Sequence, residues 1–149
     1  MTRLLSLAAL LVASPLVHGQ PQSSADVVTW TAQLTRSSGA SVLVLDAVIA
    51  EGWRVYAPGS PVGRPLRLRF DVGDVVESVS TSRPSAGRDA STGQRYLYFS
   101  DRLRIEATLA GGMAARETAS RAEVAYMACN DRLCLRPSRS RIALRALSR

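Results

Sequence analysis

The sequence predicts an all-β sandwich, and two observations carry that prediction. Apolar and polar residues alternate along much of the chain, for example at Val28, Trp30, Ala32 and Leu34, and such alternation is the signature of a half-buried strand. Segments rich in glycine, proline and serine interrupt the alternation at regular intervals, as turns do. About eight short strands over about 130 residues are typical of an immunoglobulin-like β-sandwich.

The expected strands are the stretches rich in β-branched and aromatic residues between these interruptions. Ser41–Ala50 carries apolar residues on both of its sides, so we expect it to be buried on both faces. Gly52–Tyr56 continues this strand after a break. Further strands are expected at Leu66–Phe70, Val75–Ser80, Tyr96–Phe99, Arg102–Leu109, Ala122–Ala128 and Arg139–Leu147.

The stretches between these strands have the composition of connections. Ala57–Pro65 is rich in proline and glycine and is expected to form a loop. Arg83–Gln94 contains no apolar residue larger than alanine, which predicts an exposed loop. Ala110–Gly112 has the composition of a turn, and Ala114–Ala122 is long enough for two helical turns at most.

The chain begins like an exported protein. Arg3 precedes an apolar run, and small residues at Val17 and Gly19 complete the layout of a secretory signal peptide over residues 1–19. The run is shorter than the roughly 20 apolar residues of a spanning helix, and Ser14-Pro15 interrupts it. We therefore expect cleavage of this segment and a periplasmic location for the mature protein.

Removal of the signal peptide would leave a chain of the size of one domain. We expect a polar, disordered start over residues 20–25 and a folded domain over residues 26–149. No later stretch is apolar enough to cross a bilayer, so the mature chain is expected to lack a transmembrane segment.

The composition excludes several classes of enzyme. The single histidine, His18, lies in the segment expected to be removed, and all 19 basic residues are arginine. Serine-histidine triads, histidine metal sites and lysine Schiff bases are therefore unavailable to the mature protein. The acidic residues are scattered, and nothing in the sequence pairs two of them for hydrolysis.

The formal net charge of +7 raises the question of an anionic partner. Nucleic acid is the usual partner of so basic a chain, but export argues against it, and no nucleic-acid binding is expected. The arginines alternate at Leu66–Phe70 and Arg139–Arg141, which places them on one strand face. A solvated face explains this pattern, and attraction to an acidic partner or to an anionic membrane surface is the second interpretation.

The only two cysteines, Cys129 and Cys134, enclose four residues that begin Asn130-Asp131. Asparagine and aspartate favour a turn, and a four-residue hairpin loop would place the cysteines opposite each other on antiparallel strands. The Cα atoms would then lie roughly 4.5–5.5 Å apart, which a disulfide tolerates. The spacing predicts a disulfide that forms after export to an oxidising compartment.

Three roles for this cysteine pair are open on the residues alone. Closing so short a loop stabilises a fold by only about 2 kcal/mol, which favours a redox-active bond over a structural staple. The neighbours Arg132 and Arg136 favour a thiolate, whereas Asp131 opposes one. Capture of Cu(I) by the cysteines and Met127 is the third possibility, although structural zinc would need four ligands.

The residues flanking the cysteines resemble a known redox hairpin. Val124, Tyr126 and Cys129 form Val-x-Tyr-x-x-Cys, and Cys134 and Pro137 form Cys-x-x-Pro. This pattern resembles the active-site hairpin of the periplasmic amino-terminal domain of the thiol:disulfide interchange protein DsbD. A bare pair of cysteines with four residues between them would be weak evidence; the flanking residues make the resemblance specific.

The resemblance extends upstream of the cysteines. Gly52–Tyr56 resembles the glycine-aromatic-x-x-tyrosine strand of that family, and Tyr98–Ile105 resembles the strand before the active-site pair. The family implies an immunoglobulin-like domain that relays electrons, with Cys129 and Cys134 as the exchanging, catalytic pair. Candidate neighbours of this pair are Tyr126, Asn130, Asp131 and Tyr98, although core packing is the alternative interpretation for Tyr126.

This chain departs from the family pattern in three respects. The membrane and thioredoxin-like domains are absent from it, so the expected electron donor is a thioredoxin-like protein in trans. The insert between the cysteines is four residues, shorter than in the best-known members. The family shields the disulfide with an aromatic ring on a cap loop, but the stretch Gly87–Gln94 holds no aromatic residue. Either Tyr96 or Tyr98 substitutes for that ring, or the cysteine pair is less protected from stray oxidation.

The leading functional hypothesis is a periplasmic thiol–disulfide oxidoreductase of the protein-disulfide reductase type. It would relay electrons from a thioredoxin-like donor to oxidised, disulfide-containing acceptors, with no cofactor and no metal. The alternative is a non-enzymatic periplasmic interaction module in which the disulfide is a structural staple of the hairpin.

Overall fold

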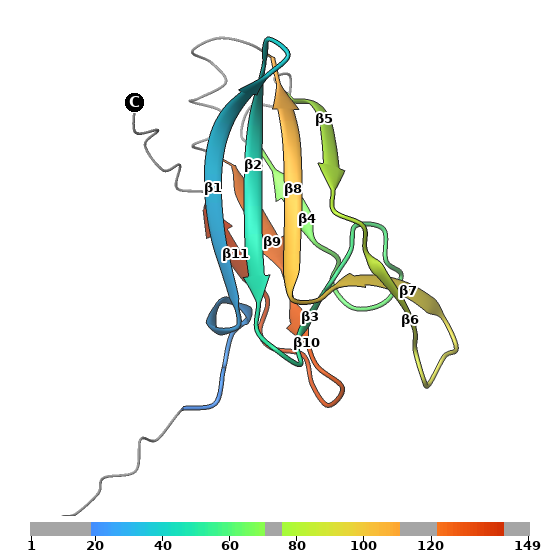
Figure 1. Ribbon diagram of the computed structural model, residues 1–149. Helices are drawn as coiled ribbons and strands as arrows, with labels where there is room; N and C mark the ends of the chain where they lie inside the picture. The colour runs from blue at the N-terminus through green and yellow to red at the C-terminus, as the bar shows by residue number, and fades with distance from the viewer. Residues whose placement is uncertain (1–18, 71–75, 111–121, 142–149) are drawn as a thin grey trace, which may run out of the picture.

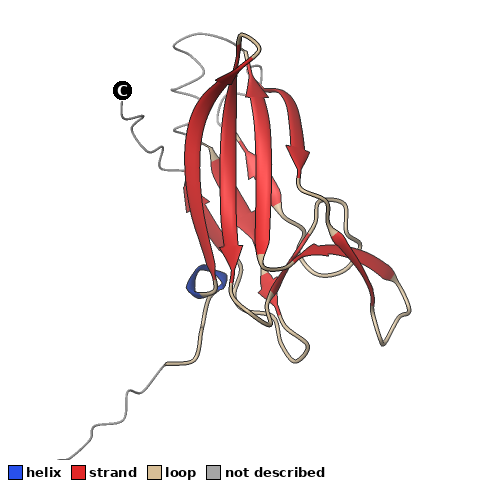
Figure 2. Ribbon diagram, in the orientation of Figure 1, coloured by secondary structure: helices blue, strands red, loops and turns tan. Residues whose placement is uncertain are grey.

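The computed structural model describes residues 19–70, 76–110 and 122–141, and almost all regular structure in them is β-strand (Figure 2). The one helix of these residues is the single 3₁₀ turn η1 (Ser24–Asp26). Nothing in this part of the chain forms a helix with the length and apolarity needed to cross a membrane. Residues 1–18 of the expected signal peptide, the turn at 111–112, the helical stretch 114–121 and the end of the last strand lie outside the described residues.

Four long antiparallel strands form the first sheet, in the order β1-β2-β8-β5 (Figure 1). They are β1 (Val28–Ser37), β2 (Ala40–Ile49), β8 (Arg102–Leu109) and β5 (Val76–Thr81). Ser38 and Gly39 join β1 to β2 with φ of 50° and 85°, the left-handed conformation that a two-residue hairpin turn requires.

Two further sheets make up the opposing layer. The sheet of β11 (Ser138–Arg141), β9 (Glu123–Tyr126) and β4 (Arg67–Arg69) lies behind the first sheet (Figure 1). The sheet at one end of the sandwich has the order β10-β3-β7-β6. Its strands are β10 (Ala128–Cys129), β3 (Arg54–Tyr56), β7 (Arg95–Phe99) and β6 (Ser85–Arg88).

The core fills the space between these layers. Leu43, Leu45 and Leu103 point into it from the first sheet and are at most 1% exposed. Val55 and Val124 meet them from the opposing layer, and both are fully buried. This packing of two β layers on one apolar interior confirms the predicted immunoglobulin-like sandwich.

The structure corrects two of the sequence predictions for strands. The predicted burial of β2 on both faces holds only for part of the strand, because on its outer side Val44 is buried whereas Val48 is 53% exposed. The predicted exposed loop at 83–94 contains the strand β6, which pairs with β7 in a hairpin. Strand β6 has the sequence Ser-Ala-Gly-Arg and so shows no alternation of apolar residues. Its pairing with β7 depends instead on backbone hydrogen bonds and on the turn that follows.

Asp89 organises that turn. Its carboxylate accepts hydrogen bonds from the hydroxyls of Ser91 and Thr92 and from both of their backbone N–H groups. The Ser91 hydroxyl and the Thr92 hydrogen bonds lower the pKa of Asp89 to about 2, so its charge is present at all physiological pH values. The turn then closes with Gly93 at a φ of 69°.

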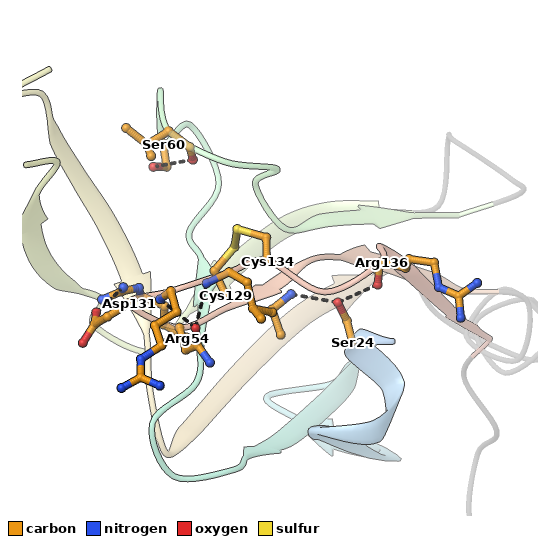
Figure 3. Close-up of a disulfide and its surroundings, with 12 residues drawn as sticks. Ser24, Arg54, Ser60, Cys129, Asp131, Cys134 and Arg136 are labelled. Atoms are coloured by element: carbon orange, nitrogen blue, oxygen red, sulfur yellow. Dashed lines mark hydrogen bonds and ion pairs between the residues drawn. A yellow bond between two sulfur atoms is a disulfide. The ribbon is translucent and has the colours of Figure 1, made fainter. Parts of the chain in front are cut away.

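Ser24, within the stretch expected to be a disordered start, makes hydrogen bonds to residues far along the chain. The backbone N–H and the hydroxyl of Ser24 both donate to the carbonyl of Arg136, at 3.0 and 2.9 Å (Figure 3). The hydroxyl oxygen also accepts the backbone N–H of Ala128 at 2.8 Å. Because Ser24 is fully buried, these bonds fasten the start of the chain between the two strands that flank the cysteine hairpin.

Replacing Ser24 with alanine should leave the buried N–H of Ala128 without a partner. We expect Ser24→Ala to lower the free energy of unfolding by about 1–3 kcal/mol in urea titrations. Ser37→Ala, at the exposed end of β1, is the matched control and should change it by less than about 0.5 kcal/mol. Equal losses in both variants would show that the Ser24 bonds carry no particular weight.

Candidate active site around the hairpin disulfide

A tight turn holds the two cysteines together. The N–H of Asn130 donates to the carbonyl of Leu133 at 2.9 Å. The side-chain carbonyl of Asn130 accepts the backbone N–H groups of Arg132 and Leu133 at 2.8 and 2.9 Å. Asn130 therefore shapes the turn through its own side chain, as asparagine commonly does at the start of a loop.

Cys129 and Cys134 form the predicted disulfide, and they face each other across an antiparallel bridge. Their Cα atoms are 4.0 Å apart, closer than the expected separation. Backbone hydrogen bonds join the pairs on either side, Asn130 with Leu133 and Ala128 with Leu135. The cysteines thus occupy a non-hydrogen-bonded position, where opposing residues approach most closely.

The two cysteines differ sharply in exposure. Cys129 is 1% exposed and packs in a small apolar cluster with Tyr56 and Tyr96. Cys134, at the other end of the turn, is an exposed residue. A partner approaching from solvent therefore reaches Cys134 first.

The sheet β10-β3-β7-β6 has the core on one face and the cysteine site on the other. On the core side, Ala128 pairs with Val55, and Val55 pairs with Phe99. On the other side, Cys129 pairs with Arg54 and lies near Tyr56, the next residue of β3 on that side. Successive side chains of a strand point to opposite faces, so one sheet supplies both the core and the floor of the site.

Three tyrosines, Tyr56, Tyr96 and Tyr98, form a tyrosine cluster on this floor. The ring centroids of Tyr56 and Tyr96 are 5.4 Å apart in an edge-to-face arrangement, and those of Tyr96 and Tyr98 are 5.8 Å apart. Gly87 gives the Tyr96 ring its space, since a Cβ at Gly87 would lie 2.6 Å from that ring. Aromatic cover of Cys129 thus comes from the strands themselves.

Arg54 ties the cysteine turn to this floor. Its Nη2 donates to Asp131 at 2.6 Å, and its Cζ lies 6.0 and 5.9 Å from the ring centroids of Tyr96 and Tyr98 (Figure 3). Burial alone would lower the pKa of the Arg54 guanidinium, but the Asp131 hydrogen bond and the negative charge beside it raise that pKa above its ordinary value. Arg54, which is paired with Cys129 across the strands, therefore stays positively charged.

The loop at 57–65 covers the cluster from the solvent side, and we call it the covering loop. Its Val62 packs against the cluster that contains Cys129. Its Gly63, at a φ of 72°, lies against the Tyr56 ring so closely that a Cβ would be 2.3 Å from a ring carbon. The sequence predicted a loop here, but only the structure shows that it lies over the site.

The structure gathers some of the predicted site residues and separates one. Asn130 and Asp131 lie in the turn, and Tyr98 belongs to the tyrosine cluster. Tyr126 lies in the main core, 2% exposed and with its ring centroid 5.5 Å from that of Trp30, which confirms its core interpretation. It does not join the cluster around Cys129.

Sequence reasoning missed Arg54 as a contact of the site. The signal was present in the alternation itself, since Arg54 and Tyr56 lie two residues apart on one strand face, as do Tyr96 and Tyr98. The missing information was the pairing of β3 with β10, which brings Arg54 opposite Cys129.

Comparison with protein-family models and with curated proteins finds no match to this sequence. Solved structures do match. The N-terminal periplasmic domain of ScsB from Proteus mirabilis aligns with 77% of this chain and 44% of its own, at 16% identity and a TM-score of 0.52. The complex between the DsbD N-terminal and PilB N-terminal domains from Neisseria meningitidis contains a chain that aligns over 76% of this one and 80% of its own, at 13% identity and a TM-score of 0.52.

This chain has the fold of the DsbD and ScsB amino-terminal domains. The reduced form of the Neisseria meningitidis DsbD N-terminal domain also aligns, over 74% of this chain and 80% of its own, at 15% identity and a TM-score of 0.49. The matches to the ScsB domain and to the DsbD–PilB complex confirm, for the fold, the resemblance that the cysteine hairpin predicted.

The contact between Gly63 and Tyr56 can be tested by adding one methyl group. Gly63→Ala should destabilise the protein by about 1–3 kcal/mol more than Gly59→Ala, as measured by urea unfolding. Gly59 is the matched control because it lies in the same loop at a φ of 76°, and a Cβ there would meet nothing within 4 Å. Equal destabilisation by both variants would show that the covering loop does not rest on Tyr56.

Proposed function

We infer that this domain is a periplasmic thiol–disulfide relay of the protein-disulfide reductase type, with Cys129 and Cys134 as the exchanging pair. The observation that carries this proposal is the unequal exposure of one disulfide, with Cys134 open to solvent and Cys129 buried beside Arg54. An exchange reaction needs an accessible sulfur for the attack, and it is faster where the surroundings of the other sulfur stabilise the thiolate that leaves.

The reaction proceeds through a mixed disulfide. A thiolate of the donor attacks Sγ of Cys134, the bond between Cys134 and Cys129 breaks, and Cys129 leaves as a thiolate. A second donor thiolate then attacks the donor's own sulfur, which releases Cys134 as a thiolate and oxidises the donor. Two electrons have moved to the domain. Cys134 then attacks one sulfur of an acceptor disulfide and displaces the other as a thiolate, and Cys129 attacks Cys134, which re-forms the domain disulfide and releases the acceptor as a dithiol.

The surroundings of Cys129 suit its role as the leaving sulfur. Arg54 is the residue paired with Cys129 on the neighbouring strand, and a positively charged residue near a cysteine stabilises the thiolate that the attack releases. The tyrosine cluster and Val62 keep Cys129 from solvent. Stray oxidants therefore meet Cys134, while the second sulfur stays available for rapid closure of the disulfide.

The hairpin also argues against a purely structural bridge. Asn130 already fixes the turn with three hydrogen bonds, and Arg54 fixes it again through Asp131. A disulfide that closes so short a loop adds only about 2 kcal/mol by the chain-entropy estimate. The bond therefore adds little as a staple to a turn that other contacts define.

The proposed partners are proteins. A thioredoxin-like protein in trans would be the electron donor, and oxidised, disulfide-containing proteins would be the acceptors. A structure titled as a complex of the DsbD and PilB N-terminal domains supports association of this fold with other domains. The periplasmic description of the ScsB domain and the signal-like start of this chain support a periplasmic location.

Trapping experiments should separate the roles of the two cysteines. Cys129→Ala retains the exposed Cys134 and should accumulate a mixed disulfide with a thioredoxin-fold protein that lacks its resolving cysteine and whose attacking cysteine is activated with a thionitrobenzoate leaving group, as seen on non-reducing gels. Cys134→Ala retains only the buried Cys129 and should accumulate several-fold less in the same time, because the partner cannot reach it. Equal trapping by both variants, or trapping only by Cys134→Ala, contradicts this assignment.

The redox potential distinguishes a relay from a staple. Equilibration with glutathione buffers should give a potential between those of thioredoxin and DsbA, about −270 and −120 mV, because a relay must both accept and pass on electrons. Mass spectrometry after alkylation measures the reduced fraction. A potential well below about −300 mV would instead identify the bond as a structural bridge in a non-enzymatic interaction module.

A further inference from the structure

The two arginine-rich segments of the sequence meet on one sheet face. β4 and β11 flank β9, so Arg67, Ala125 and Arg139 lie side by side across the three strands. The next outward row contains Arg69, Glu123 and Arg141. The four arginines of these rows are all exposed, and we call this surface the arginine face.

The arginine face is hollow rather than flat. A cavity of about 640 Å³ opens on it, and Ala125 belongs to its floor because its small side chain stands between two arginines. Arg64, Arg67, Arg69 and Arg139 line this cavity, and no carboxylate lies among the described residues that line it. The bordering Glu123 reaches Arg139 only at 4.0 Å.

The spacing of these guanidinium groups suits several carboxylates on one chain. Neighbouring strands are about 4.8 Å apart and a strand rises about 3.3 Å per residue, so Arg67 lies roughly 10 Å from Arg139 and roughly 7 Å from Arg69. These are separations along the backbone, so one phosphate would engage two of the arginines only where their long side chains converge on it. Carboxylates spaced along an acidic protein segment can each meet one arginine, which pairs with a carboxylate through two parallel hydrogen bonds.

The arginine face lies close along the chain to the disulfide. Pro137 and Ser138 line the cavity and follow Cys134 by three and four residues. Arg64 and Pro65 also line it, and they end the covering loop whose Val62 packs against the cluster of Cys129. A protein that reaches Cys134 therefore has the arginine face within its footprint.

We propose that the arginine face is a docking site for an acidic segment of the protein that exchanges disulfides with this domain. The choice of an exchange partner rests on the proposed function, whereas the binding of acidic protein segments does not. The concave shape favours a protruding protein segment over a flat lipid surface. Complementary charge of this kind mainly raises the rate of association and makes that rate depend on salt.

A peptide-binding experiment tests the surface without any redox step. Binding of fluorescein-labelled hexaglutamate to the oxidised protein is followed by fluorescence anisotropy at low salt, with hexaglutamine as the uncharged probe. Arg67→Glu with Arg139→Glu should weaken hexaglutamate binding at least about tenfold. Arg36→Glu with Arg102→Glu, both exposed on the first sheet, makes the same change in net charge and should leave binding within about twofold.

Three results of that experiment would overturn the proposal. The first is an equal loss of binding in both double variants, because net charge alone would then explain it. The second is full displacement of the peptide by an equal concentration of inorganic phosphate, which would identify a site for single anions. The third is tighter binding to phosphatidylglycerol vesicles than to hexaglutamate with the same dependence on Arg67 and Arg139, which would identify a membrane contact.

A kinetic experiment tests the link to disulfide exchange. The double variant Arg67→Glu with Arg139→Glu should be reduced by an acidic thioredoxin at least about tenfold more slowly than the unmodified protein at low salt. Its reduction by dithiothreitol should be unchanged, because that reagent needs no docking. An unchanged thioredoxin rate would overturn the docking role. If neither reagent reduces the unmodified protein, the proposed function fails, and hexaglutamate binding alone then decides this proposal.

Discussion

The register between β3 and β10 is the constraint on which the site depends. Ala128 opposite Val55 contributes to the core, and Cys129 opposite Arg54 contributes to the site. Because strand side chains alternate between faces, a slip of one residue would bury Arg54 in the core and move Cys129 away from the tyrosine cluster. Apolar burial in the sandwich therefore sets the position of the cysteine pair, and the hydroxyl of Ser24 joins Ala128 of β10 to Arg136, which follows the cysteine turn.

This arrangement gives one disulfide two different environments. Cys129 shares an apolar cluster with Tyr56 and Tyr96, and the guanidinium of Arg54 lies against the same tyrosine rings. Cys134 is only one turn away but is exposed. The asymmetry follows from the strand pairing, because Cys129 is paired with Arg54 of β3, whereas the bridge recorded for Cys134 is the one to Cys129.

The aromatic residues that cover Cys129 come from strands β3 and β7 and not from the stretch 87–94. The sequence indicated that the stretch 87–94 lacks an aromatic shield, and the structure places Tyr56 and Tyr96 around Cys129 instead. Gly87 makes room for one ring and Gly63 for the other. In the sequence these glycines of β6 and of the covering loop indicate only a loop. In the structure they leave the space that the two tyrosine rings occupy.

The sequence by itself determined the β class of the fold, most strand positions and the disulfide. These features depend on local patterns: alternation of apolar residues, turn-forming residues, and two cysteines close enough for one hairpin. It did not reveal β6, because strand β6 contains only Ser85, Ala86, Gly87 and Arg88 and is stabilised by pairing with β7. Nor did it predict the buried position of Ser24, because the hydrogen-bond partners of Ser24 lie more than 100 residues away in the chain.

Only the tertiary structure decided which residues surround the cysteines. Arg54 is 75 positions before Cys129 in the sequence, yet the two are paired across strands. The two arginine-rich segments were visible in the sequence, but their meeting on one hollow face depends on β9 lying between them. Strands pair in the register that buries their apolar residues in one common core. That core consists of contacts between segments far apart in the sequence, so a local sequence pattern cannot predict it.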